Sequence, residues 1–310
     1  MQQQHHVDAT TPLLGSAPST GRPTKERPVM LGDYEILGLL ARGGTGGVYL
    51  GSHVQTGARV AIKMLDPHWR KHDDVVNRML AEYEVSRCVS HVGLLEVRAA
   101  ERMWDGTPYL VMELLDGENL GELVERGTIV MNAIAAIGAQ IADAAAALHD
   151  AGVIHCDLKP DNVFVLYQSG LNGWPRIKVI DYGVSQREAQ HDDSTIAGTP
   201  SCMPPEQWRG EPVTKSDVYA LGCVLYWMVT GAPPFHGPLP QLMMSHTSAL
   251  PARPSTIRDL PSELERIIMR ALAKDPAMRP TMKDMARDLA AFAAQYPTTQ
   301  EIQLLEAKAS

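Results

Sequence analysis

The sequence is poor in the features that mark several classes of protein. It has four cysteines in 310 residues, Cys88, Cys156, Cys202 and Cys223, and no two of them lie close together in the chain. Disulfide scaffolds and zinc sites need clustered cysteines, so we expect reduced thiols in a reducing compartment. The eleven histidines show no metal-ligand spacing. These absences exclude a disulfide-rich secreted domain and a cysteine–histidine metal domain.

Positive charge and long apolar runs are also scarce. The chain has 28 basic against 36 acidic side chains, a net charge of -8. Nucleic-acid binders concentrate basic residues, so we expect no nucleic-acid partner. The two most apolar stretches are unsuited to a membrane span, because 132–154 is interrupted by polar residues and 218–230 is too short. The N-terminus lacks a charged-then-apolar signal pattern. The sequence therefore predicts a cytoplasmic protein with no membrane segment in this chain.

The order of local patterns predicts an α+β fold. Residues 1–32 are rich in Gln, Thr, Pro, Ser and Gly without apolar periodicity, which indicates a disordered tail. A sheet-forming region with one helix follows, and after Asp116-Gly117 the chain is mainly helical. The expected strands are 34–40, 48–53, 59–65, 109–114, 163–166 and 177–180, and the expected helices are 75–89, 132–150, 215–230, 262–273 and 282–294.

Two motifs in the first region suit the binding of phosphate. The segment Leu40–Tyr49 places four glycines between two strands, and glycine lets backbone N–H groups approach a phosphate closely. Alone, such a segment is more often a plain turn. The next strand carries Lys63 among apolar residues, where an ammonium group needs an anionic partner. A lysine that extends along the surface to water would explain Lys63 equally well in isolation.

A third pattern decides between these readings. The segment His155–Asn162, with the sequence His-Cys-Asp-Leu-Lys-Pro-Asp-Asn, follows an alanine-rich helix, and Asp181-Tyr182-Gly183 follows the next strand. In these motifs and their order the chain resembles the protein-kinase superfamily, in particular the bacterial branch of the eukaryotic-like serine/threonine kinases. The resemblance covers about residues 33–292. It implies a small antiparallel-sheet N-lobe with one helix at 33–114, a larger helical C-lobe at 115–292, and a C-terminal tail at 293–310 that could be helical.

The resemblance implies a role for each catalytic residue. Asp157 would accept the proton of a substrate hydroxyl, and Lys159 would contact the γ-phosphate. Lys63 would hold the α- and β-phosphates of ATP. Asn162 and Asp181 would supply oxygen ligands for Mg²⁺, with Mn²⁺ as an alternative.

An acidic partner for Lys63 comes from the predicted helix 75–89. Glu82 lies nine residues before His91, a spacing that resembles the family's helix-to-loop junction, and we therefore expect it to pair with Lys63. Glu84 stays the alternative.

The same resemblance assigns the contacts to ATP. Met112 would stand behind the adenine, although core packing alone would also explain it. The backbones of Glu113 and Leu115 would bond the adenine edge. The full set of expected nucleotide contacts is Ala41, Arg42, Gly43, Gly44, Gly46, Val48, Ala61, Lys63, Met112, Glu113 and Leu115.

The second half of the chain carries the residues that imply a protein substrate. The segment Gly198–Gln207 resembles the peptide-binding end of an activation segment, and Thr199 within it would bond Asp157 and Lys159. Glu206 would form a buried ion pair with Arg279, and Asp217 would anchor the backbone of the catalytic loop. These residues favour serine or threonine hydroxyls of proteins over small molecules as acceptors. The sequence does not indicate the oligomeric state.

Four positions depart from the family pattern, and one of them, Pro204 in place of an alanine, is expected to be harmless. Ala41 stands at the first glycine of the phosphate loop, Tyr182 replaces a phenylalanine, and Cys156 replaces the arginine that normally pairs with a phosphorylated activation segment. Without that cation, activity should depend little on activation-segment phosphorylation at Ser194 or Thr195. Ala41 and Cys156 also support the alternative of a nucleotide-binding pseudokinase or scaffold.

Overall fold

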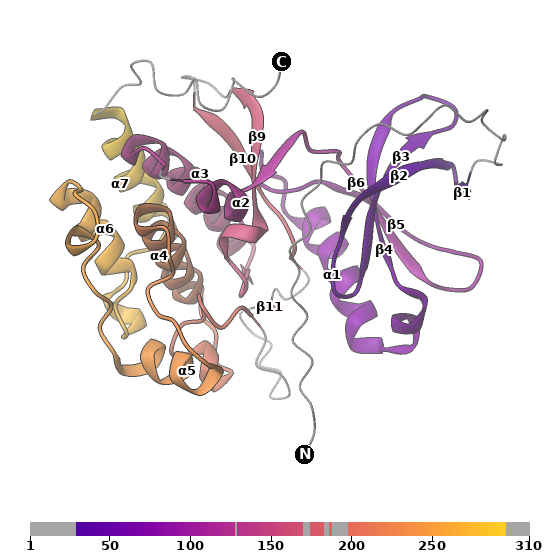
Figure 1. Cartoon of the computed structure of the whole chain (residues 1–310). Helices are drawn as coiled ribbons and strands as arrows, with labels where there is room; N and C mark the ends of the chain where they lie inside the picture. Colours follow the sequence, from indigo (N-terminus) through magenta and orange to yellow (C-terminus); the bar gives the residue numbers. More distant parts are fainter. Residues whose placement is uncertain (1–28, 128, 170–173, 183–185, 188–197, 296–310) are drawn as a thin grey trace.

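The computed structural model describes residues 29–127, 129–169, 174–182, 186–187 and 198–295. Within them the chain forms an N-lobe built on a sheet and a helical C-lobe (Figure 1), so the predicted bilobal α+β fold is confirmed. The N-lobe sheet is antiparallel, with strand order β1-β2-β3-β4-β6-β5. Its strands are β1 (Val29–Leu31), β2 (Tyr34–Arg42), β3 (Gly46–His53), β4 (Arg59–Leu65), β5 (Val97–Arg102) and β6 (Pro108–Met112).

Helix α1 (Asp73–Cys88) covers one face of this sheet. Asp73 and Asp74 occupy its first turn and Arg87 its last, which complements the helix dipole at both ends. Val76 and Met79 point into the core that the helix shares with Leu110 and Met112 of β6. The helix therefore carries Glu82, one turn after Met79, to the same buried face.

The predicted disordered tail, residues 1–32, is wrong for its last residues, which are folded. Val29–Leu31 forms β1, which pairs with the start of β2 through a two-residue turn at Gly32-Asp33. Gly32 has φ +55°, a conformation that glycine adopts readily. A strand of three residues is too short to show an alternating pattern, and the composition of the segment before it dominated the prediction.

The cross-strand register fixes which side chains share a face of the sheet. Val48 of β3 stands opposite Lys63 of β4, and Ala61 of β4 stands opposite Met112 of β6. Directly opposite residues project from the same face, and so do residues two apart along a strand. Val48, Ala61, Lys63 and Met112 therefore lie together on the face that α1 covers. The opposite face is closed by a second cluster that includes Ile62 and Val111.

The C-lobe is built from helices around a buried central one. Its elements are α2 (Leu120–Glu125), α3 (Met131–Asp150), α4 (Thr214–Thr230), α5 (Leu239–Ser248), α6 (Ser262–Ala271) and α7 (Met282–Gln295), with short strands β7 (Gly117–Asn119), β8 (Val153–Ile154), β9 (Val163–Ser169), β10 (Pro175–Val179) and β11 (Gln186–Arg187). Nearly all of α4 is buried, and such a helix is apolar on every side. The chain leaves β8 directly into the loop His155–Asn162, so this helical core supports that loop.

Helix α3 packs closely between α4 and α7. A Cβ atom at Gly138 would lie 2.6 Å from Leu225 of α4 and 3.2 Å from Leu289 of α7, so only glycine allows this approach. Among the described residues α3 is the one helix long and apolar enough to span a membrane, but 67% of its most apolar window is buried inside the protein. It is packed as a core helix.

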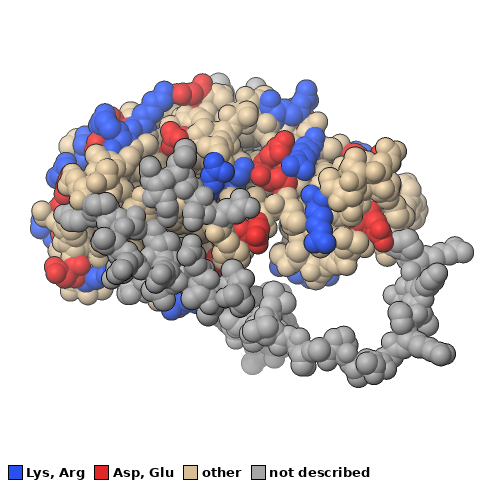
Figure 2. Space-filling model, turned by 90° about the horizontal axis from the view of Figure 1, so that it is seen from above, with Lys and Arg blue, Asp and Glu red and all other residues tan. Residues whose placement is uncertain are grey.

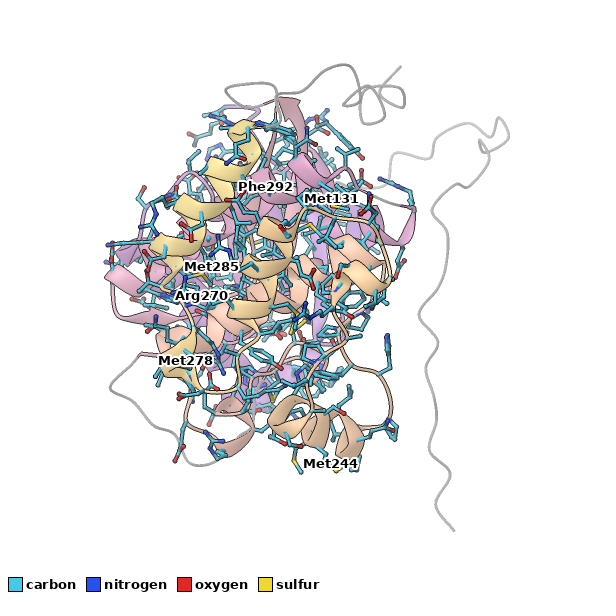
Figure 3. All side chains as sticks on the ribbon, turned by 90° about the vertical axis from the view of Figure 1, so that its left-hand side faces the viewer. Met131, Met244, Arg270, Met278, Met285 and Phe292 are labelled. Atoms are coloured by element: carbon cyan, nitrogen blue, oxygen red, sulfur yellow. The ribbon has the colours of Figure 1, made fainter. Side chains whose placement is uncertain are left out.

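The C-terminal helix extends past the predicted end of the domain at residue 292. Helix α7 runs to Gln295, so residues 293–295 belong to it, and the rest of the predicted tail lies outside the described residues. Figure 3 shows Met285 and Phe292 along this helix, and both side chains are buried. Ala293, the next residue, is buried as well, so the apolar face of the helix continues past residue 292.

Candidate functional site

Lys63 lies between two carboxylates that come from different lobes. Its Nζ atom is 2.5 Å from Glu82 Oε1 and 3.5 Å from Asp181 Oδ1. Glu82 belongs to α1, and Asp181 follows β10 of the C-lobe. Glu84, the alternative partner, is exposed and lies beside Arg87. The structure thus brings together Lys63, Glu82 and Asp181.

The three charges shift one another's pKa. Burial alone would lower the pKa of Lys63, but the carboxylates of Glu82 and Asp181 outweigh it and raise this pKa, so the ammonium group persists at neutral pH. Burial alone would raise the pKa of Asp181, but Lys63 outweighs it and holds this pKa below its usual value. Burial dominates at Glu82, the deepest of the three, and raises its pKa. The carboxylate of Asp181 is therefore ionised and can supply an oxygen ligand to a metal ion.

In the loop His155–Asn162, two side chains contact the carboxylate of Asp157, and Thr199 contacts it from another segment. Asp157 Oδ1 accepts a hydrogen bond from Thr199 Oγ1 at 2.6 Å, and its Oδ2 accepts one from Asn162 Nδ2 at 3.0 Å. Lys159 Nζ lies 3.3 Å from the same Oδ2 atom. We expected Thr199 to bond both Asp157 and Lys159, and the structure instead places Lys159 beside the other oxygen of Asp157. A hydroxyl, an amide and an ammonium group thus hold one carboxylate.

Asn162 and Asp181 offer oxygen atoms that suit a magnesium ion. Asn162 turns its Nδ2 atom toward Asp157, so its Oδ1 atom is the oxygen that a metal ion could take. Within the described residues no three His, Cys, Asp or Glu side chains form a metal cluster. Mg²⁺ commonly takes one or two protein oxygens and completes its shell with phosphates and water. Asn162 and Asp181 match that demand.

The backbone of the loop is anchored from α4. Asp217 accepts hydrogen bonds from the N–H groups of His155 and Cys156, each at 2.9 Å. Cys156 has φ 65°, an unusual conformation for a residue with a side chain, and such a residue persists only when its surroundings hold it. His149 Nε2 lies 2.8 Å from Asp217 Oδ2 as well. We did not foresee His149, whose position at the end of α3 was the available signal.

A buried ion pair anchors the end of the segment Gly198–Gln207. Arg279 donates from Nη1 to Glu206 Oε1 at 2.6 Å and from Nη2 to Oε2 at 3.0 Å. Ser216 donates to the same carboxylate. Arg279 also bonds carbonyl oxygens, including that of Lys215, so its remaining N–H groups are satisfied. Loss of one partner of such a pair typically costs about 3–5 kcal/mol.

The glycine-rich segment forms the turn between β2 and β3. Gly43 N–H donates to Gly46 O at 2.8 Å. A Cβ at Gly46 would lie 1.9 Å from the carbonyl oxygen of Met64 in β4, so this glycine is required by packing whatever it binds. Ala41 and Arg42 end β2, and both are exposed. Gly44 lies in the same turn.

The segment between the lobes is fixed to both of them. The N–H of Glu113 donates to Glu96 O at 3.0 Å, which leaves its carbonyl oxygen as the group for an adenine. The Glu113 side chain accepts from Lys178 Nζ at 2.6 Å and from the Glu96 N–H at 2.8 Å. Leu115 follows, half-buried. Met112 ends β6 and is buried in the core.

A cavity of about 800 Å³ borders this segment, and neither Lys63 nor Asp157 lines it. It is lined by Leu114 and Leu115 together with residues of α3, α7 and β10. The cavity is therefore distinct from the site around Lys63 and Asp157.

The surface carries charges of both signs on the face that Figure 2 presents. Figure 2 shows basic and acidic side chains interspersed there.

Comparison with known proteins agrees with this geometry. The family model "Protein kinase domain" matches residues 34–289. The chain is 35% identical to serine/threonine-protein kinase Pkn1 of Myxococcus xanthus over 298 residues, which cover 89% of this chain and 42% of that protein. It is 36% identical to probable serine/threonine-protein kinase PknB of Corynebacterium glutamicum over 273 residues, 83% of this chain and 41% of that protein.

A third relative has the same pattern. The chain is 38% identical to serine/threonine-protein kinase PkaA of Streptomyces coelicolor over 269 residues, 81% of this chain and 48% of that protein. The chain thus spans less than half the length of each of these three relatives. Because the family model covers both lobes and every catalytic motif, the chain belongs to the protein kinase domain family.

Proposed function

We propose that this chain is a serine/threonine protein kinase that transfers the γ-phosphoryl group of ATP to protein hydroxyls in the cytoplasm. The observation that carries the proposal is the carboxylate of Asp157, held by Thr199, Asn162 and Lys159. Relatives named serine/threonine-protein kinases support it. The four cysteines are thiols, which suits a reducing compartment.

In the proposed reaction Asp157 orients the substrate hydroxyl and accepts its proton. The hydroxyl oxygen forms a bond to the γ-phosphorus, the bond from that phosphorus to the β–γ bridging oxygen breaks, and ADP leaves. Lys63 holds the α- and β-phosphates, and Lys159 neutralises charge on the transferred group. Asn162 and Asp181 would hold Mg²⁺, which supplies positive charge to the phosphates when it is bound. Glu82 keeps Lys63 in place.

The residues around Asp157 suggest where the acceptor and the nucleotide would bind. We call Gly198–Gln207 the substrate segment, and the bond from Thr199 to Asp157 supports a peptide hydroxyl as the acceptor. The Glu113 carbonyl and the Leu115 backbone would bond the adenine. The shared face of β3, β4 and β6, with Val48, Ala61 and Met112, would cover it.

Substitution of the base tests the activity. We expect Asp157→Asn to lower phosphoryl transfer to a generic basic protein at least about 100-fold, because the proton acceptor is lost. Asp161→Asn is the matched control, since Asp161 is an exposed carboxylate of the same loop. Intact mass after incubation with Mg-ATP measures the product. Normal ATP affinity in the wild type without phosphate gain on any polypeptide would instead favour the pseudokinase.

The second part of the proposal is activity without activation-segment phosphorylation. Cys156 supplies no cation for a phosphate. Ser194 and Thr195 lie outside the described residues. Their joint replacement by alanine should leave kcat within about twofold of wild type, and a loss beyond about tenfold would contradict this part alone.

A further inference from the structure

The peptide unit between Cys156 and Asp157 is fixed at both ends. The carbonyl oxygen of Cys156 accepts a hydrogen bond from Gln207 Nε2 at 2.6 Å, and the N–H of Asp157 donates to His155 Nδ1 at 3.3 Å. The N–H of Cys156 is held in turn by Asp217. Rotation of this peptide unit would swing the Asp157 side chain, so the bond from Gln207 bears directly on where the carboxylate points.

Gln207 is itself held rigidly. It follows Glu206, whose carboxylate is locked by Arg279, and both Glu206 and Gln207 are buried. The anchored ion pair therefore fixes the backbone from which the Gln207 amide reaches the catalytic loop. The loop and this segment are far apart in sequence, and this bond joins them directly.

The substrate segment passes over the same bond. A Cβ at Gly198 would lie 2.3 Å from Gln207 Nε2 and 2.8 Å from the Cys156 carbonyl oxygen, and Gly198 has φ +125°. Only glycine fits there. Thr199, the next residue, donates to Asp157. The substrate segment thus closes over the Gln207 bond and contacts the carboxylate that the bond helps to aim.

We propose that Gln207 is a positioning residue for phosphoryl transfer: its side-chain amide sets the Cys156–Asp157 peptide and so aims the Asp157 carboxylate. The tie is a neutral hydrogen bond, and it needs no phosphate on the activation segment. The inference rests on the proposed kinase function and gives it a physical basis in a chain with Cys156 before the catalytic aspartate.

Gln207→Met tests the inference, because methionine keeps the volume and removes the amide. The matched control is Gln140→Met on α3, where the Gln140 amide bonds the backbone carbonyl of Pro175 at 2.9 Å, away from the loop. In protein stripped of phosphate, we expect Gln207→Met to lower kcat about tenfold with KM for ATP within about twofold. Gln140→Met should lower the melting temperature and leave kcat within about twofold.

Either of two kinetic results would overturn the inference: a folded Gln207→Met protein with kcat within about twofold of wild type, or equal losses of kcat in both variants. Gln207→Leu replaces the methionine variant if that protein does not fold. Amide hydrogen exchange of the catalytic-loop peptide gives a readout independent of turnover, and it should accelerate in the Gln207 variant only. If the wild type transfers no phosphate the kinase proposal fails, and the exchange rates still decide the role of Gln207, since unchanged exchange overturns it.

Discussion

Tyr182 shows how a single buried hydroxyl can join two segments of the chain. Its side chain is buried, and its oxygen accepts from the N–H of Leu95 at 2.7 Å and donates to Val179 O at 2.8 Å. Burial raises the pKa of this hydroxyl, which therefore stays neutral. The bonds tie the residue after Asp181 to the segment that leads from α1 to β5. A phenylalanine could fill the space but could not make this tie.

We expect Tyr182→Phe to lower the free energy of unfolding by about 1–2 kcal/mol. The loss stays moderate because the N–H of Leu95 also lies 3.0 Å from Val179 O and keeps that partner. Asp181 should be held less firmly, so the affinity for Mg-ATP should fall several-fold. Denaturant unfolding and ATP titration measure both effects. Tyr167→Phe, at an exposed tyrosine, should change neither, and equal losses in the two variants would contradict the explanation.

For single residues, the sequence predicts contacts between side chains that belong to one short motif. Asp157, Lys159 and Asn162 sit within one loop, so their juxtaposition could be predicted from the order of residues. The bond from Gln207 to Cys156 spans 51 positions and that from His149 to Asp217 spans 68. The local pattern around Gln207 does not distinguish it from a surface side chain, and the position of His149 at the end of α3 does not indicate its distant partner.

Among the elements, the predictions are best where burial is continuous. The predicted helix at 215–230 corresponds to α4, whose apolar run is long. Helix α2, Leu120–Glu125, and strand β1, Val29–Leu31, are too short for a periodic pattern, and both were missed. Their positions depend on partners in other segments, here the β2 strand for β1.

Helix α7 offers a test of where the domain ends. Phe292 is fully buried, although it lies beyond the family match that ends at residue 289. We expect Phe292→Ala to lower the free energy of unfolding by about 3–5 kcal/mol, because the change leaves a cavity in the core. Urea denaturation measures it. Met278→Ala, at a methionine that is 65% exposed, should cost less than about 0.5 kcal/mol. A similar small cost at Phe292 would place the end of the folded core before α7's last turns.

For the molecule as a whole, one buried histidine sets a pH limit on stability. His246 lies in the C-lobe core between Tyr219 and Phe235. Burial, with the charge of Lys274 as a second cause, lowers its pKa to about 4. The unfolded chain therefore binds a proton below about pH 6.5 that the folded chain resists. Stability from this group is complete above that pH and is lost as the pH falls toward 4.

We therefore expect the wild type to lose unfolding free energy between pH 7.5 and 5 with a slope of up to about 1.4 kcal/mol per pH unit below pH 6.5. In His246→Asn that slope should flatten, because the titrating group is gone. Guanidinium denaturation at a series of pH values measures it. His236→Asn, at an exposed histidine nearby, should keep the wild-type slope. Parallel curves for all three proteins would show that His246 does not set the limit.

The distribution of thiols has a practical consequence. Cys88 is exposed, whereas Cys156, Cys202 and Cys223 are buried. A maleimide dye should therefore label the native chain once and the denatured chain four times, which mass spectrometry can count. Cys88 ends α1, the helix that carries Glu82. The protein thus holds a natural attachment point for a fluorophore that can test, without any engineered cysteine, whether this helix moves when a nucleotide is added.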